Sequence, residues 1–178
     1  MERWDIYDIN RCKTGRTALR GCSAAEGGLQ EGEYHLVVHI CIFNTKGELL
    51  MQRRQKDKEG YPDMWDVSAA GSALAGETSA QAAARELFEE LGIAHDFSSE
   101  RPFLTSNFER GFDDWYFIQR DVDLCELHLQ AQEVQDARWI DLAGVEQMME
   151  QGKMIPYYPD FVRLWFAMRL HRGTTTHE

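Results

Sequence analysis

The chain has 178 residues, 43% of them apolar and 11% aromatic, which suffices for the core of one domain and is too little for two. Its formal net charge of −11 and pI near 5.0 argue against a nucleic-acid backbone or an anionic membrane surface as main partner, since both need clustered positive charge. There is no apolar run of the roughly 20 residues that span a bilayer and no signal-peptide pattern, so we expect a single-domain cytoplasmic protein. The sequence leaves its oligomeric state open.

The N-terminal third predicts three strands. Trp4–Asp8 alternates between apolar and polar residues and predicts a short edge strand, whereas the rest of residues 1–33 is expected to be irregular or partly helical. The run HLVVHICIF, His35–Phe43, is rich in β-branched and aliphatic residues and predicts a buried strand. Asn44–Gly47 then predicts a hairpin turn into a strand at Glu48–Arg54.

The rest of the chain alternates between expected strands and helices. Met64–Ala70 predicts a strand that delivers Gly71 to a glycine-rich loop, and a helix is expected at Thr78–Leu91. Further strands are expected at Arg101–Phe108, Asp114–Arg120 and Ala137–Ile140, with helices at Leu142–Glu150 and Pro159–His171, the latter within a closing segment, residues 157–171. This mixture predicts an α/β sandwich.

The helix at Thr78–Leu91 carries three closely spaced carboxylates. Glu86, Glu89 and Glu90 are at i, i+3 and i+4, and we expect them on the side opposite an apolar stripe that includes Leu87. Like charges at this spacing repel one another and destabilise an isolated helix. A divalent cation reverses the sign of that effect, because carboxylate oxygens are the hard ligands that Mg²⁺ and Mn²⁺ prefer.

The stretch that contains this helix, GSALAGETSAQAAARELFEELGI, resembles the Nudix box, G-x5-E-x7-R-E-U-x-E-E-x-G-U, in which U is a bulky aliphatic residue. It matches at every defined position of residues 71–93: Gly71, Glu77, Arg85, Glu86, Leu87, Glu89, Glu90, Gly92 and Ile93. The resemblance implies a Nudix-type α/β/α sandwich with a mixed sheet. It also implies pyrophosphohydrolase activity, in which water cleaves the diphosphate linkage of a nucleoside diphosphate bound to another group X.

The resemblance implies roles for residues of the box. Glu86, Glu89 and Glu90 match metal ligands of the family, helped by the carbonyl of Gly71, and the implied cofactor is Mg²⁺ or Mn²⁺. Glu86 is also a candidate general base. Arg85 is expected to pair with an acidic neighbour and so fix the helix against the loop. The implied partner is a small-molecule diphosphate, whose charge the metal would offset.

An acidic residue outside the box extends this list. Many family members add one in the loop before a late strand, and Glu133 stands there, so we nominate it as an extra ligand or an alternative base. An ordinary exposed glutamate is the other interpretation. Asp113 and Asp114 are weaker candidates for the same role.

The densest basic stretch precedes the box. It contains Arg53, Arg54, Lys56 and Lys58, and a solvated loop explains both lysines equally well. For Arg53 and Arg54 we favour contact with substrate phosphates, because a guanidinium can bind two phosphate oxygens at once. Lys58 is included among the candidate substrate-binding residues.

Two alternative functions remain open. From His35 to Arg169 the chain looks most like the isopentenyl-diphosphate isomerase branch of Nudix proteins and its hydrolase relatives. The isomerase needs a cysteine before the box glycine and a histidine after it, where this chain has Ala70 and Ser72. The second alternative, a non-catalytic nucleotide-binding module, would be expected to lose box glutamates. Hydrolase is therefore the favoured function.

Overall fold

The structure, a computed structural model, describes residues 1–171, 173 and 175. The chain divides into two compact units: residues 1–40, 69–89 and 93–116 form the first, and residues 41–68, 90–92 and those from 117 on form the second. Three elements begin in the first unit and end in the second: β3 (His35–Phe43), α1 (Ser79–Leu91) and β8 (Gly111–Gln119). A single domain over residues 1–178 stays a prediction.

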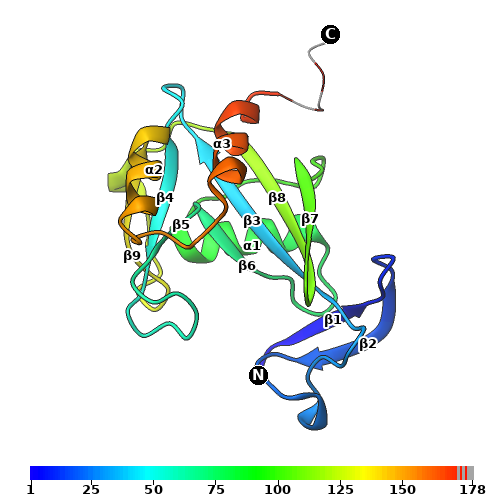
Figure 1. The fold of residues 1–178 in the computed structure, drawn as a ribbon. Coiled ribbons are helices and arrows are strands. Elements are labelled where there is room, and N and C mark those ends of the chain that lie inside the picture. The colour runs from blue at the N-terminus through cyan, green and yellow to red at the C-terminus, as the bar shows by residue number, and fades with distance from the viewer. Residues whose placement is uncertain (172, 174, 176–178) are drawn as a thin grey trace. The chain divides into compact units, whose positions relative to one another are not determined.

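The first unit begins with a two-stranded ribbon, blue in Figure 1. β1 (Arg3–Tyr7) pairs antiparallel with β2 (Lys13–Leu19), and Ile6, Ala18 and Leu29 are buried in one apolar cluster. The strand at β1 was expected, but β2 corrects the expectation of an irregular or partly helical segment. Its first four residues, KTGR, are all exposed, so the sequence shows no alternating pattern there.

The larger sheet of the first unit contains β6 (Ala69–Ser72) and β7 (Leu104–Phe108). β6 pairs antiparallel with β3, with Gly71 opposite Val38, and β7 pairs antiparallel with β8. Gly71 therefore lies inside a strand, not at the start of the loop as expected. Hydrogen bonds at both ends show that β3 and β8 run parallel: His35 N donates to Arg110 O at 3.0 Å, and Arg120 N donates to Phe43 O at 2.9 Å. The sheet is mixed.

In the second unit, β4 (Leu49–Arg54) pairs with β3, with β5 (Trp65–Asp66) and with β9 (Val134–Ile140), all antiparallel. The single strand expected at Met64–Ala70 is divided into β5 and β6. Ser68, between them, satisfies backbone groups with its side chain: Oγ donates to Leu50 O at 2.6 Å and accepts from Ile42 N at 2.9 Å. These bonds replace ladder hydrogen bonds at that point.

Two helices belong to the second unit, coloured yellow and orange-red in Figure 1. α2 (Leu142–Glu150) has the predicted bounds and begins where Asp141 accepts a hydrogen bond from Gly144 N. α3 (Pro159–Met168) begins at a proline, buries Val162, Trp165 and Phe166, and ends three residues earlier than predicted. The mixed sheet and the helices confirm the expected α/β sandwich. No helix among the described residues is long and apolar enough to cross a membrane.

The hairpin turn and the later strands lie close to their predicted positions. Gly47 takes φ +80° in the predicted hairpin turn, where its N–H donates to Asn44 O at 2.9 Å. The expected strands at residues 101–108, 114–120 and 137–140 correspond to β7, β8 and β9, with starts shifted by three residues.

Candidate metal-binding and catalytic site

Arg85 is the centre of the site in the first unit. Its Nε donates to Glu77 Oε1 at 2.8 Å, and its Nη2 donates to Glu77 Oε2 at 3.0 Å and to the carbonyl of Ser72 at 3.1 Å. Its Nη1 donates to Glu86 Oε1 at 2.9 Å and to Glu89 Oε2 at 3.0 Å. The guanidinium thus joins the loop after β6 to α1, as the sequence predicts for a charged pair.

The charges of this pair stabilise each other. The hydrogen bonds that Arg85 donates to Glu77 are the main cause that raises the pKa of Arg85 above its ordinary value. Burial raises the pKa of Glu77, but hydrogen bonds from Arg85 and from Leu74 N outweigh burial and leave this pKa below its ordinary value. Both groups are therefore ionised at neutral pH.

Glu86 lies directly against the backbone of Gly71. A Cβ added to Gly71 would lie 2.1 Å from Glu86 Oε1, so only glycine leaves room for this carboxylate. The Glu86 side chain is 13% exposed, and burial raises its pKa despite the nearby charge of Arg85. A carboxylate with a raised pKa holds a proton more readily, which suits a general base.

α1 continues into the second unit at Glu90, whose surroundings differ from those expected. Glu90 is buried, beside the buried Leu91, and not on a polar face opposite the apolar stripe. Its Oε2 accepts from Gln52 Nε2 at 2.7 Å. Gln52 is not among the residues predicted for the site, although a polar residue after three apolar ones in LLMQRR was a usable signal. Gln52 Oε1 is buried without a partner among the described residues.

The acidic side chains fit a divalent cation in their chemistry. Among residues 1–171, 173 and 175, no group of three or more His, Cys, Asp or Glu side chains is arranged to hold a metal ion. Arg85 instead contacts Glu86 and Glu89, and Gln52 contacts Glu90. Glu86, Glu89 and Glu90 offer carboxylate oxygens from one helix, and oxygen is the donor type that Mg²⁺ requires.

The basic candidates lie in the second unit, with their side chains engaged. Arg53 donates to the carbonyl of Asp63 at 3.3 Å and to its carboxylate at 3.0 Å. Arg54 donates to the carbonyl of Gly60 from Nε at 3.2 Å and from Nη2 at 3.0 Å. Lys58 forms an ion pair with Glu133, so two candidates predicted for different roles contact each other.

The two weaker acidic candidates have structural partners in the first unit. Asp114 is completely buried and accepts hydrogen bonds from Arg11, from Ser79 and, at 2.6 Å, from Thr105 Oγ1. Asp113 Oδ1 lies 3.1 Å from His39 Nε2. Both carboxylates therefore have partners within the fold, and we assign neither of them a ligand role.

Comparisons with known proteins identify the family and the fold of the chain. A family model described as the NUDIX domain matches residues 33–161. An uncharacterized Nudix hydrolase of Listeria monocytogenes is 51% identical over 177 residues, 99% of each chain. An isopentenyl-diphosphate Delta-isomerase of Escherichia coli is 30% identical over 118 residues, 62% of this chain and 64% of that one. Among solved structures, that of DR0079 from Deinococcus radiodurans has the same fold, with a TM-score of 0.74, 24% identity, and coverage of 92% of this chain and 98% of that one.

Proposed function

We propose that this chain, which belongs to the Nudix hydrolase family, cleaves a diphosphate linkage in a small molecule of the type nucleoside diphosphate linked to a group X, with Mg²⁺ or Mn²⁺ as cofactor. Water attacks one phosphorus, the bridging phosphorus–oxygen bond breaks, and two phosphate monoesters leave. The net charge of −11 is compatible with such a substrate when a cation offsets the phosphates.

The contact between Glu86 and Gly71 supports this proposal more than any other. A Cβ added to Gly71 would lie only 2.1 Å from Glu86 Oε1, so the carboxylate occupies the space of a side chain at that position. The missing side chain of Gly71 lets the Glu86 carboxylate approach the backbone of β6, as expected where that backbone takes part in a site. A charged helix face that merely contacts solvent has no need of such a fit.

The residues of the box have separate roles. Glu86, Glu89, Glu90 and the carbonyl of Gly71 would hold the ion, and a bound Mg²⁺ or Mn²⁺ supplies positive charge at the phosphates. Glu86 is also the proposed general base that accepts the proton of the attacking water, because its carboxylate lies directly against the backbone of Gly71 in the site. Arg85 acts in catalysis by fixing α1 to the preceding loop through Glu77.

Residues outside the box complete the proposal. Arg54 and Lys58 contact substrate phosphates, and Lys58 does so while its ammonium stays paired with Glu133. Glu133, which holds Lys58 in the structure, is the alternative base or an extra ligand. Arg53 lines a cavity together with Asp63, Arg138 and Lys153, so it is left out of this set.

The isomerase-like alternative has one observation in its favour, the likeness to isopentenyl-diphosphate Delta-isomerase. Proton transfer to carbon by a thiol needs a reactive cysteine, and Ala70 stands where that family has one. Cys41 is completely buried, and burial raises its pKa well above the ordinary value, so this thiol is a poor candidate. Hydrolysis is the better supported reaction.

A substrate screen tests the proposal. Nucleoside diphosphates, triphosphates, NDP-sugars, dinucleotides and isoprenoid diphosphates are incubated with the protein and Mg²⁺ or Mn²⁺, and the products are separated by chromatography and identified. We expect turnover of at least one diphosphate-linked nucleotide and its loss in excess chelator. Isomerisation of isopentenyl diphosphate without phosphate release would instead establish the isomerase.

A further inference from the structure

Two cavities of the second unit adjoin each other. One has a volume of about 410 Å³ and the other about 640 Å³, and Met64 and Gly152 belong to the walls of both. Each volume lies in the range typical of sites for small molecules. The shared wall makes it possible for one ligand to occupy both.

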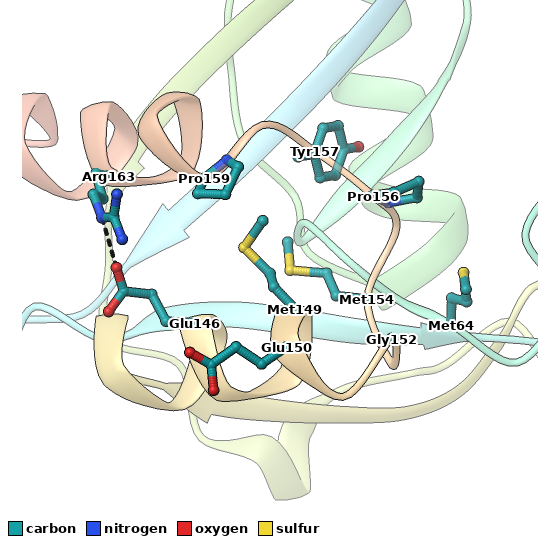
Figure 2. Close-up of a pocket in the computed structure, with 10 residues that line it drawn as sticks. All are labelled: Met64, Glu146, Met149, Glu150, Gly152, Met154, Pro156, Tyr157, Pro159 and Arg163. Atoms are coloured by element: carbon teal, nitrogen blue, oxygen red, sulfur yellow. Dashed lines mark hydrogen bonds and ion pairs between the residues drawn. The ribbon is translucent and has the colours of Figure 1, made fainter.

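The smaller cavity, drawn in Figure 2, is mainly apolar. Met149 from α2 and Met154 from the segment after it lie, in this view, between the Glu146–Arg163 ion pair on one side and Met64 on the other. Three methionine side chains can adjust to an irregular apolar shape because they are unbranched and flexible. An alkyl chain or an apolar ring fits this lining.

The larger cavity is lined by an excess of positive charge. Arg53, Arg138 and Lys153 face it with one carboxylate, that of Asp63. Arg53 uses Nε and Nη2 on Asp63, so its Nη1 stays available. Among the described residues, the ammonium of Lys153 has no hydrogen-bond or ion-pair partner.

Arg138 is held in place for binding. Its Nε and Nη2 contact Asp136 at 2.9 Å and 2.7 Å, and its guanidinium carbon lies 5.3 Å from the centre of the Trp65 ring. The remaining Nη1 has two N–H donors. A guanidinium fixed in this way pays little entropy when it binds an anion.

The two cavities and Glu90 lie on opposite faces of β4. Gln52 contacts Glu90, and the next residue, Arg53, lines the larger cavity. Successive side chains of a strand point to opposite faces, so Arg53 and Glu90 are separated by the sheet. An anion that binds Arg53 would therefore lie in the larger cavity, away from Glu90.

We propose that the two cavities form one binding site for an amphipathic anion. Its apolar part lies among Met64, Met149 and Met154, and its phosphate or carboxylate group contacts Arg138 and Lys153. The site needs no divalent cation, because its positive charge comes from the protein.

Calorimetry with octyl phosphate, in excess chelator, tests this site directly. We expect binding that is about tenfold or more tighter than that of octanol or inorganic phosphate, since each contains only half of the recognised features. Octanoate tests whether the site prefers a carboxylate or a phosphate head group. Binding of octanoate or octyl phosphate that is tighter than that of octanol supports the site. No binding of octyl phosphate or octanoate, or equally tight binding of octanol, would refute it. Chelator removes any hydrolysis, so failure here leaves the hydrolase proposal intact.

Variants locate the binding. Lys153→Glu, at an exposed position, should weaken octyl phosphate about tenfold or more by charge reversal, whereas Lys46→Glu, an exposed lysine outside both cavities, should change affinity less than about twofold. Met149→Trp should weaken octyl phosphate by filling the apolar cavity, with folding checked by circular dichroism. Equal affinity of Lys153→Glu and the unchanged protein contradicts the proposal.

Discussion

Arg85 and Glu77 form two parallel hydrogen bonds, Nε to Oε1 at 2.8 Å and Nη2 to Oε2 at 3.0 Å. Such a pair requires the planar fork of a guanidinium, which an ammonium cannot replace. The same side chain also reaches Ser72, Glu86 and Glu89, so it connects β6, the loop and α1. The stability of this region therefore depends on the shape of the cation as well as its charge.

Arg85→Lys should lower the free energy of unfolding by about 1–3 kcal/mol, because a lysine leaves at least one charged hydrogen bond of Glu77 unmade. Urea denaturation measures the loss. Arg163→Lys is the matched control, since Arg163 pairs with Glu146 and Asp160 in an exposed position, where a smaller loss is expected. Equal losses for both variants would show that the fork of Arg85 has no special role.

Gly71→Ala should leave the protein folded and lower kcat about tenfold or more. The new Cβ displaces the Glu86 carboxylate, which is the flexible end of a side chain, and catalysis is sensitive to shifts of about 1 Å. Gly60→Ala is the control, because a Cβ there has no atom within 4 Å. Steady-state rates and circular dichroism decide the matter. Normal kcat in Gly71→Ala would remove Glu86 from the proposed base and ligand roles.

The sequence predicted those parts of the fold whose pattern is local. β3 and α2 have their predicted bounds because their apolar runs and the Asp141 cap lie within the elements themselves. The box motif likewise predicted the Arg85 pair. β2 was not predicted, because it is stabilised by pairing with β1 and by the burial of Ala18. Both arise only in the folded chain.

Contacts between distant segments were also beyond sequence reasoning. Gln52 and Glu90 are 38 residues apart, and nothing in either segment indicates that one is the partner of the other. Lys58 and Glu133 were predicted separately, as a phosphate contact and as an acid. Burial of Glu90 follows from the position of α1 on the sheet and not from the spacing of its charges.

The ion pair of Lys58 and Glu133 should act as a unit in substrate binding. Glu133→Gln and Lys58→Ala are each expected to raise KM several-fold. The KM of the double variant should not exceed that of the single variant with the higher KM, because one substitution already breaks the pair. A complete double-mutant cycle measures the coupling. A fall of two decades in kcat for Glu133→Gln alone would instead make Glu133 the general base.

The stability of the protein should increase between pH 4 and pH 6.5. Burial lowers the pKa of His35 from 6.5 to about 4, so in this window the unfolded chain binds more protons than the folded one. A single group with this shift contributes about 3 kcal/mol across the window. Urea titrations at several pH values give the slope.

His35→Phe should flatten that slope, because phenylalanine can keep the aromatic contacts of His35 with Trp4 and Phe108 without titrating. His128→Gln, a change at an exposed histidine, should leave the slope as it is. An unchanged slope in His35→Phe would show that another group is responsible.

The most direct test of the metal-dependent hydrolase is the rate of Glu89→Gln with the best substrate over a titration of Mg²⁺. The Glu89 side chain is 47% exposed, so the amide should leave the protein folded although it loses the charge that pairs with Arg85. We expect kcat to fall by about two decades or more, since a proposed ligand charge is removed, while Glu109→Gln, an exposed control, keeps its rate. A near-normal kcat in Glu89→Gln, or full activity of the unchanged protein in excess chelator, would contradict the proposed function.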